Sequence, residues 1–319
     1  MAPAEPRPAS PAAVAPAPAI ELTSASRWYG NVVAVNNISF TVGPGVTGLL
    51  GPNGAGKSTI LHMAAGFLKP SSGTVEVLGG PAWLNPEIYR NVGLVPEREA
   101  VYPFLTGYEF VLLNARLHKL PAPHDAAMRA IRAVGMEDAR HRAMGGYSKG
   151  MKQRVKFATA IVHDPALLLL DEPFSGADPR QRLQMTDLLR EMAAEGRTIV
   201  FSSHILEEVE RLADNVLVIV GGRLAASGDF HQIRRLMTDR PHTFTLRSGD
   251  NRRLASALVA DPSVVGIELT DDRLSVRASD FGGFAVAAPR VARASGVTLF
   301  EFLPTDESLE SVFSYLVER

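Results

Sequence analysis

The chain of 319 residues contains no cysteine. This absence excludes disulfide bonds, thiolate nucleophiles, cysteine-ligated zinc and iron–sulfur clusters. Long apolar runs are also missing, since the longest, such as Ala166–Leu170, fall far short of the about 20 residues that span a bilayer. No charge of one sign dominates, because 33 basic residues face 34 acidic ones and the formal net charge is −1. We therefore expect no membrane-spanning segment and no general attraction to nucleic acid.

Changes in composition divide the sequence into three expected parts. Residues 1–19 are rich in proline and alanine, which predicts a disordered or extended tail. In residues 20–235, short apolar runs alternate with segments of helical periodicity, which predicts an α/β domain with a parallel sheet. In residues 240–319 the predicted order βαββαβ is typical of a ferredoxin-like α+β domain, and a further helix is expected at Glu307–Val317.

The short apolar runs of the second part are typical of strands that are buried on both faces of a sheet. We expect strands at Ile38–Val42, Val46–Leu50, Thr74–Leu78, Asn91–Val95, Leu167–Leu170, Thr198–Phe201 and Val216–Val220. We expect helices at Ser58–Phe67, Met151–His163, Pro179–Ala194 and Leu206–Ala213, with a largely helical subdomain over residues 98–163.

The segment Gly51–Ser58 fits the phosphate-loop pattern GxxxxGK[ST]. It lies between a predicted strand and a predicted helix, a context that a chance glycine-rich turn would lack. The glycines let the backbone aim its amides at phosphate oxygens, and the helix adds its positive N-terminal end. We predict that Lys57 contacts the β- and γ-phosphates of a nucleotide and that Ser58 ligates Mg²⁺. The predicted nucleotide contacts here are Gly51, Asn53, Gly54, Ala55, Gly56, Lys57, Ser58 and Thr59.

Two acids, Asp171 and Glu172, follow the predicted strand Leu167–Leu170. Because neighbouring side chains on a strand point to opposite sides, we expect the two carboxylates to take different tasks. Asp171 is predicted to hold Mg²⁺, and Glu172 to accept a proton from the attacking water. The alternative is an acidic turn at a strand end, which the nearby phosphate loop disfavours.

The segment Tyr147–Arg154 reads Tyr-Ser-Lys-Gly-Met-Lys-Gln-Arg and resembles the signature motif of ABC ATPases, usually written LSGGQ. Ser148 and Gly150 match the motif, and Lys149 replaces its first glycine. These residues precede a predicted helix whose N-terminal amides suit a γ-phosphate. Read alone, the segment is also compatible with a basic helix that Ser148 caps.

Other family motifs follow in the expected order. Ser175–Asp178 resembles the D-loop, with Ala177 where leucine is usual, and the resemblance makes Asp178 a nucleotide-site residue. His204 resembles the switch histidine that contacts the γ-phosphate, although a lone histidine at a strand end is more often structural.

The remaining two motifs are less regular. Tyr29 resembles the aromatic residue that stacks on adenine, with Trp28 as a competing candidate and core packing as the alternative for both. Glu97 stands where the family's Q-loop has glutamine, and it is predicted to reach Mg²⁺ or the attacking water.

The resemblance is closest to the ATPase subunits of type-2 ABC exporters. It implies a P-loop ATPase that uses ATP and Mg²⁺, closes as a head-to-tail homodimer or with a paired ATPase subunit, and drives a separate permease of about six spans. It places the chain on the cytoplasmic face of the cell membrane and implies no nucleic-acid partner. The candidate docking surface lies near residues 98–118, where Tyr102, Phe104 and Leu105 are equally compatible with buried core.

Two other classes share related cassettes. DNA-repair and chromosome-organising ATPases insert long coiled coils between the two halves of the site, and this chain has no sustained heptads. Translation-associated ATPases carry two cassettes in one chain, and this sequence has one. For residues 240–319 we expect a dimer-stabilising or regulatory role, with a ligand sensor as the alternative. Asp271-Asp272 is interpreted as a hairpin turn, not a metal site.

Overall fold

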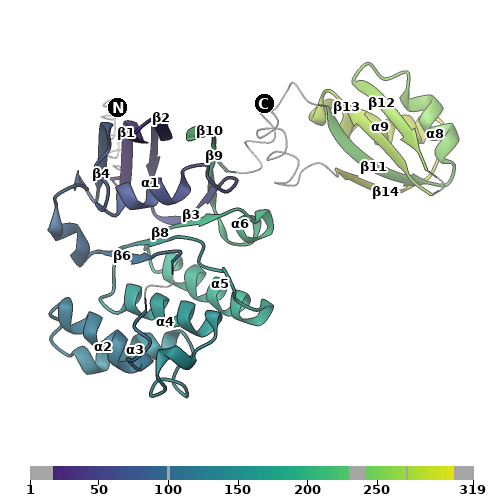
Figure 1. Ribbon diagram of the computed structural model, residues 1–319. Helices are drawn as coiled ribbons and strands as arrows, with labels where there is room; N and C mark the ends of the chain where they lie inside the picture. The colour runs from purple at the N-terminus through teal and green to yellow at the C-terminus, as the bar shows by residue number, and fades with distance from the viewer. Residues whose placement is uncertain (1–16, 99–100, 230–240, 271, 305–319) are drawn as a thin grey trace, which may run out of the picture.

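The computed structural model describes residues 17–98, 101–229, 241–270 and 272–304, and Figure 1 shows their arrangement. Residues 1–16 of the predicted tail 1–19 and the predicted helix Glu307–Val317 lie outside the described residues. None of the helices within these ranges combines the length and the apolar character that crossing a bilayer requires.

A six-stranded sheet with the strand order β10-β9-β3-β8-β7-β6 forms the centre of the first part (Figure 1). Five of its strands pair in parallel, as expected, and the edge strand β10 pairs antiparallel with β9. The strands are β3 (Gly45–Leu50), β6 (Val92–Val95), β7 (Leu167–Leu170), β8 (Thr198–Ser203), β9 (Asn215–Val220) and β10 (Arg223–Gly228).

Strand β7 shows why this sheet lies in the interior. All four of its leucines are buried, and they alternate between two hydrophobic cores. Leu168 and Leu170 pack with the helices on one face, whereas Leu167 and Leu169 pack toward the other face. A strand with apolar residues at every position is stable only between two covered faces, as the sequence pattern indicates.

A second, antiparallel sheet with the order β2-β1-β4-β5 shares the second of these cores. Its strands are β1 (Ile20–Tyr29), β2 (Val32–Val42), β4 (Ser72–Val77) and β5 (Gly80–Pro81), and helix α1 (Lys57–Ala64) packs into the same core. Strand β1 was not expected from the sequence. Its pairing with β2 contains register shifts after Leu22, Ala25 and Arg27, and such bulges break the period-two pattern that announces a strand.

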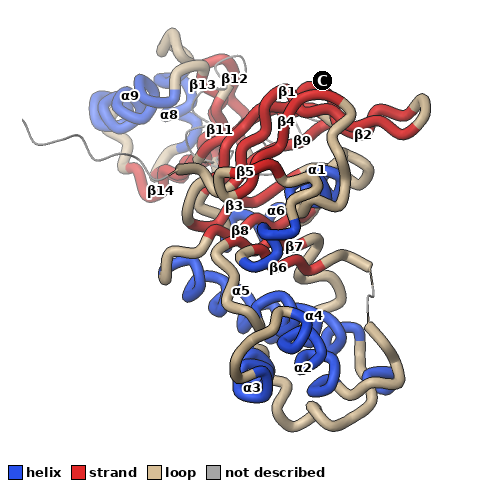
Figure 2. The backbone as a smooth tube through the Cα atoms, turned by 90° about the vertical axis from the view of Figure 1, so that its left-hand side faces the viewer, coloured by secondary structure: helices blue, strands red, loops and turns tan. Residues whose placement is uncertain are grey.

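The helical subdomain lies on the other side of the central sheet (Figure 2). It contains α2 (Gly107–Leu117), α3 (Pro123–Ala133) and α4 (Lys149–Ile161), followed in the chain by α5 (Pro179–Ala194) and α6 (Leu206–Leu212). Helix α2 begins with a capping box, in which Thr106 accepts from the Glu109 amide and the Glu109 carboxylate accepts in return from the Thr106 amide. A short 3-10 helix at Met144–Gly146 precedes α4, and another at Pro86–Arg90 precedes β6 and packs its Ile88 into the core shared with the antiparallel sheet.

The third sheet has the antiparallel order β12-β13-β11-β14 and its own hydrophobic core. Both of its helices pack on one face of the sheet (Figure 1). The elements are β11 (His242–Ser248), α8 (Asn251–Leu258), β12 (Val264–Leu269), β13 (Leu274–Ala278), α9 (Phe281–Ala294) and β14 (Leu299–Pro304). This is the expected βαββαβ order of a ferredoxin-like unit. Strands β12 and β13 pair as a hairpin, although Asp271 in its turn lies outside the described residues.

Candidate nucleotide-binding site

The phosphate loop connects β3 to α1, and two of its glycines are fixed by close backbone contacts. A Cβ added at Gly51 would collide with the Ile219 carbonyl oxygen, and one at Gly56 would collide with the Ala34 carbonyl oxygen. Gly56 also has a φ of 103°, a left-handed conformation that favours glycine. The loop therefore keeps its shape because backbone from β2 and β9 supports it from behind.

A cavity of about 290 Å³ opens above this loop. It brings together most of the residues that the phosphate-loop motif predicts, and it adds Glu97 and Glu172 from other strand ends. The lining residues are Ala34, Asn53, Gly54, Ala55, Gly56, Lys57, Ser58, Thr59, Glu97 and Glu172. Sequence positions far apart therefore converge on one site, as the motifs predict.

Lys57 is buried at the base of this cavity. Its ammonium Nζ donates to the carbonyl oxygens of Gly51 at 2.7 Å and Pro52 at 3.2 Å, and it lies 3.8 Å from Glu172 Oε1. Burial lowers the pKa of Lys57, and the surrounding carboxylates of Glu172, Asp171 and Glu97 oppose this shift by favouring the charged form. A desolvated cation at this point is suited to binding phosphate oxygens.

Asp171 and Glu172 are separated by a turn of the chain, not by strand alternation. Strand β7 ends at Leu170, and Glu172 has a φ of 48°, which is rare for a residue with a side chain. Asp171 is only 1% exposed, and its Oδ1 accepts from the Ser202 hydroxyl at 2.6 Å. The Ser202 oxygen in turn accepts from the Glu172 amide at 2.9 Å. The expectation that pleating separates the two acids was wrong, since Asp171 and Glu172 both follow the end of β7.

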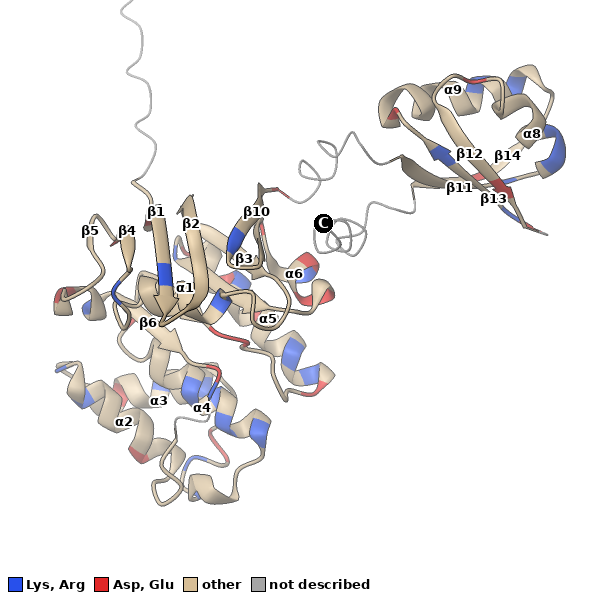
Figure 3. Cartoon of the chain, turned by 45° about the horizontal axis from the view of Figure 1, so that its top comes forward, with Lys and Arg blue, Asp and Glu red and all other residues tan. Residues whose placement is uncertain are grey.

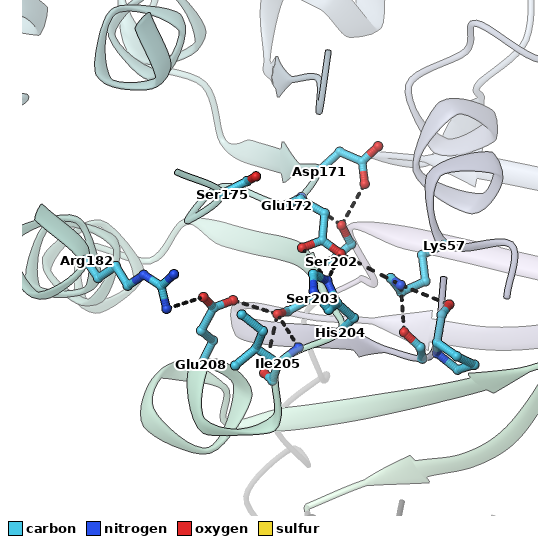
Figure 4. Close-up of polar contacts among 12 residues, drawn as sticks. Lys57, Asp171, Glu172, Ser175, Arg182, Ser202, Ser203, His204, Ile205 and Glu208 are labelled. Carbon is cyan, nitrogen blue, oxygen red and sulfur yellow. Dashed lines mark hydrogen bonds and ion pairs between the residues drawn. The ribbon is translucent and has the colours of Figure 1, made fainter. Parts of the chain in front are cut away.

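His204 follows β8 and faces the Glu172 carboxylate (Figure 4). Its Nδ1 lies 3.0 Å from both Oε1 and Oε2 of Glu172. Because an ionised carboxylate only accepts, this nitrogen carries the hydrogen and donates it. The ring therefore orients the carboxylate that was predicted to be the base.

The signature residues lie at the start of α4. The Ser148 hydroxyl accepts from the Met151 amide, so Ser148 is indeed a helix N-cap, as the alternative interpretation held. Lys149 donates to Ser175 of the D-loop at 3.1 Å. A Cβ at Gly150 would meet Gln181 Oε1, the end of a flexible side chain, and would lie 3.4 Å from the Gly176 carbonyl oxygen of the D-loop. The signature and the D-loop therefore form one packed surface.

Asp178 caps helix α5. Its carboxylate accepts from the Gln181 amide at 2.8 Å, and the Gln181 side chain accepts from the Asp178 amide. Ser148, Gly150 and Asp178 do not line the cavity over the phosphate loop. One chain thus brings the phosphate loop, Glu97, Glu172 and its partner His204 together, and leaves the signature surface apart from them.

The two candidate adenine contacts end strand β1. Trp28 is 45% exposed and Tyr29 is 44% exposed, so core packing explains neither side chain. The guanidinium carbon of Arg27 lies 4.7 Å from the centre of the Tyr29 ring and covers one face of it. Neither aromatic residue lines the phosphate cavity.

Sequence reasoning missed a polar chain that links the D-loop to the neighbourhood of His204 (Figure 4). The Arg182 Nε donates to the Ala177 carbonyl, and Arg182 Nη1 lies 3.2 Å from Glu208 Oε1. Glu208 Oε2 accepts from the Ser203 hydroxyl at 2.6 Å. Burial raises the pKa of Glu208. In the sequence, Glu208 is recognisable only as an acidic residue near the start of the predicted helix Leu206–Ala213. Acidic residues at that position are common on protein surfaces.

The predicted docking residues are divided between surface and core. Tyr102 and Phe104 are exposed, and their rings lie against each other. Leu105 is only partly buried and packs against the core of the helical subdomain. Tyr102 and Phe104 are therefore available at the surface for docking, whereas Leu105 belongs largely to the core.

Comparison with known proteins decides the family. A family model described as ABC transporter matches residues 35–175. The chain is 32% identical to the uncharacterized ABC transporter ATP-binding protein YxlF of Bacillus subtilis, over 93% of this chain and 99% of that protein. It is 33% identical to Nod factor export ATP-binding protein I of Rhizobium etli, over 94% of each chain. It is also 33% identical to the daunorubicin/doxorubicin resistance ATP-binding protein DrrA of Streptomyces peucetius, over 82% of this chain and 84% of that one.

The chain belongs to the ABC transporter ATP-binding proteins. A solved ATP-binding subunit of an ABC transporter superposes with a TM-score of 0.62 at 31% identity, covering 68% of this chain and 92% of that one. The same fold is found in a dimeric cassette solved in a post-hydrolysis state with ADP and Pi, at a TM-score of 0.62 and 21% identity, covering 66% of this chain and 98% of that one. The predicted family, fold class and function are thereby confirmed. The chain is an ABC ATPase subunit of the exporter type.

Proposed function

We propose that this ABC subunit closes head to tail on ATP, as a homodimer or with a paired ATPase subunit, and drives export through a separate permease of about six spans. The observation that carries this proposal is the division of the site. Lys57 and Glu172 line one cavity, whereas Ser148 and Gly150 lie on another surface of the same chain. A second subunit that presents its signature surface to the cavity would complete the site.

The contacts support the following residue roles. Lys57 and the backbone N–H groups of Asn53–Thr59 bind the phosphates, and Glu172 takes the proton of the attacking water. His204 holds the Glu172 carboxylate through its Nδ1 hydrogen. Tyr29 stacks on adenine with its free face, because Arg27 occupies the other. Asp178 contributes from the D-loop of the opposite subunit.

Ser58, Asp171 and Glu97 are the proposed Mg²⁺ residues, and their chemistry fits that cation. All three offer oxygen, the ligand that Mg²⁺ prefers, and Mg²⁺ commonly uses only one or two carboxylates together with phosphate oxygens and water. The Ser202 hydroxyl donates to Oδ1 of Asp171. When bound, Mg²⁺ supplies charge neutralisation at the β- and γ-phosphates.

The organisation of the chain supports a peripheral position on the cytoplasmic face of the membrane. In this proposal residues 20–235 form the ATPase domain, with the helical subdomain at about 98–163 carrying the docking surface of Tyr102 and Phe104. Residues 240–319 form an accessory domain that stabilises the dimer or regulates it, and residues 1–19 form a tail. A chain that stops at residue 238 should lose ATP-driven dimerisation on gel filtration, and an unchanged dimer would contradict the accessory role.

The deciding experiment replaces the proposed base by its uncharged isostere, Glu172→Gln. This variant should bind ATP normally, lose at least about 100-fold in turnover, and accumulate as an ATP-bound dimer. ATP turnover, nucleotide binding and gel filtration measure the three effects. Glu191→Gln, on an exposed face of α5, is the matched control. Turnover of Glu172→Gln at the wild-type rate would contradict the assignment of the base.

A further inference from the structure

A buried lysine, Lys156, lies in the middle of α4, the helix that begins at the signature residues. Helix α4 carries four basic residues, which contribute to the basic colouring seen along it in Figure 3. Lys149 is exposed, and Lys152 and Arg154 are partly exposed. Lys156 is only 4% exposed. Burying an ammonium group costs free energy unless hydrogen-bond acceptors surround it. The acceptors around Lys156 therefore show what holds its charge in the interior.

The Lys156 ammonium binds three consecutive backbone carbonyls of another segment. It donates to Pro96 O at 2.7 Å, to Arg98 O at 3.0 Å and to Glu97 O at 3.4 Å. An ammonium has three hydrogens, and these three carbonyls can take all of them. The contact joins residues about 60 positions apart, since the sequence separations are 60, 59 and 58.

The bound segment follows β6 directly and leads into the phosphate cavity. Strand β6 ends at Val95, and the side chain of Glu97 lines the cavity together with Lys57 and Glu172. The same helix that carries Lys156 begins at Ser148 and Gly150, about 10 Å away along its axis. Lys156 thus connects the signature surface to a cavity residue of the same chain.

We propose that Lys156 is a positioning residue, which fixes the backbone at Glu97 and transmits movements of α4 to the Glu97 carboxylate. This inference rests on the proposed role of Glu97 at the reacting end of ATP. Since Glu97 is one residue beyond Pro96, a small displacement of the backbone moves its carboxylate by a similar distance. Misplacement by about 1 Å can cost about 100-fold in rate without removing any binding contact.

The test compares ATP turnover of the full chain in wild type, Lys156→Met and Lys156→Arg. Methionine keeps the approximate length of the side chain but removes its charge and its hydrogen-bond donors. Arginine keeps the charge and the donors. We expect kcat of Lys156→Met to fall about tenfold with KM changed less than about twofold, and Lys156→Arg to recover most of the loss. Lys119→Met, an exposed lysine outside the site, is the control. Lys156→Gln, which keeps two donors, serves as the second variant where Lys156→Met does not fold.

A double-mutant cycle separates positioning from general stabilisation. If Lys156 acts through Glu97, its replacement should cost little in a Glu97→Ala background. Wild-type kcat in Lys156→Met, or an equal loss in both backgrounds, overturns the inference. Full turnover in Glu97→Ala alone would instead overturn the proposed role of Glu97, so the two failures are distinguishable.

Discussion

The Nδ1 atom of His204 lies 3.0 Å from both carboxylate oxygens of Glu172, so one ring hydrogen is shared between them. The two residues come from the ends of adjacent strands, β7 and β8, which pair in parallel. Since parallel strands place their carboxyl ends at the same edge, this contact is a consequence of the sheet. At Glu172 the backbone is left-handed, with a φ of 48°.

Removal of the ring should therefore affect turnover more than nucleotide binding. We expect His204→Ala to lower kcat about 100-fold, because the Glu172 carboxylate loses the donor that orients it. The KM for ATP should change little, since Lys57 and the loop amides still bind the phosphates. Steady-state kinetics of the purified subunit measure both constants. A variant whose KM rises while kcat stays unchanged would assign His204 to ground-state binding instead.

The sequence predicted those parts of the site that depend on local pattern. Lys57 and the glycines around it form a contiguous motif, and the flanking strand and helix were correctly expected. Helix α5 and strand β7 have the expected bounds. Asp178 and Pro179 mark the start of α5, and the run of four leucines defines β7. These signals depend on residues close together in the chain.

The features that were missed depend on contacts that no local pattern encodes. Lys156 reaches carbonyls of Pro96, Glu97 and Arg98, and in sequence it is one more lysine of a basic helix. Ser202 appears as part of a strand end until the fold brings it beside Asp171. Strand β1 was hidden because its bulges interrupt the alternation of side chains. Tertiary packing determines each of these.

The close approach of backbone to Gly51 gives a sharp prediction. In Gly51→Ala the added methyl group would meet the Ile219 carbonyl, a backbone atom that cannot turn aside. We expect the loop to shift and ATP affinity to fall at least about tenfold, which corresponds to about 1.4 kcal/mol. Gly196→Ala is the control, because Gly196 has a φ of 94° with open space around it and should lose only stability. Equal ATP affinities in the two variants would contradict this account of the loop.

Arg182 and Glu208 should be energetically coupled, because they link the D-loop to Ser203. Arg182 is partly exposed, so solvent screening limits the coupling energy to about 0.5 to 1 kcal/mol. A double-mutant cycle of Arg182→Met and Glu208→Gln, followed by urea unfolding, measures this coupling. We also expect Glu208→Gln to lower ATP turnover several-fold, since the adjacent His204 would be less firmly placed. Additive single effects would show that the two residues act independently.

A stacked pair of histidines predicts how stability depends on pH. The His118 and His163 rings lie 3.8 Å apart and nearly parallel. Burial, followed by the proximity of His118, lowers the pKa of His163 from 6.5 to about 4. Because the unfolded chain takes up this proton at higher pH than the folded chain, the stability is full above about pH 6.5 and falls as the pH drops toward 4.

We therefore expect the free energy of unfolding to be about 1 to 2 kcal/mol lower at pH 5.0 than at pH 7.5 from His163 alone, after allowance for its partial exposure. Urea unfolding of wild type and His163→Gln at both values measures the difference. Glutamine can still donate to the Val92 carbonyl, which His163 Nε2 contacts at 3.2 Å, but it does not titrate. The variant should lose less stability than the wild type between the two pH values. A decrease of the same size in both proteins would place the titrating group elsewhere.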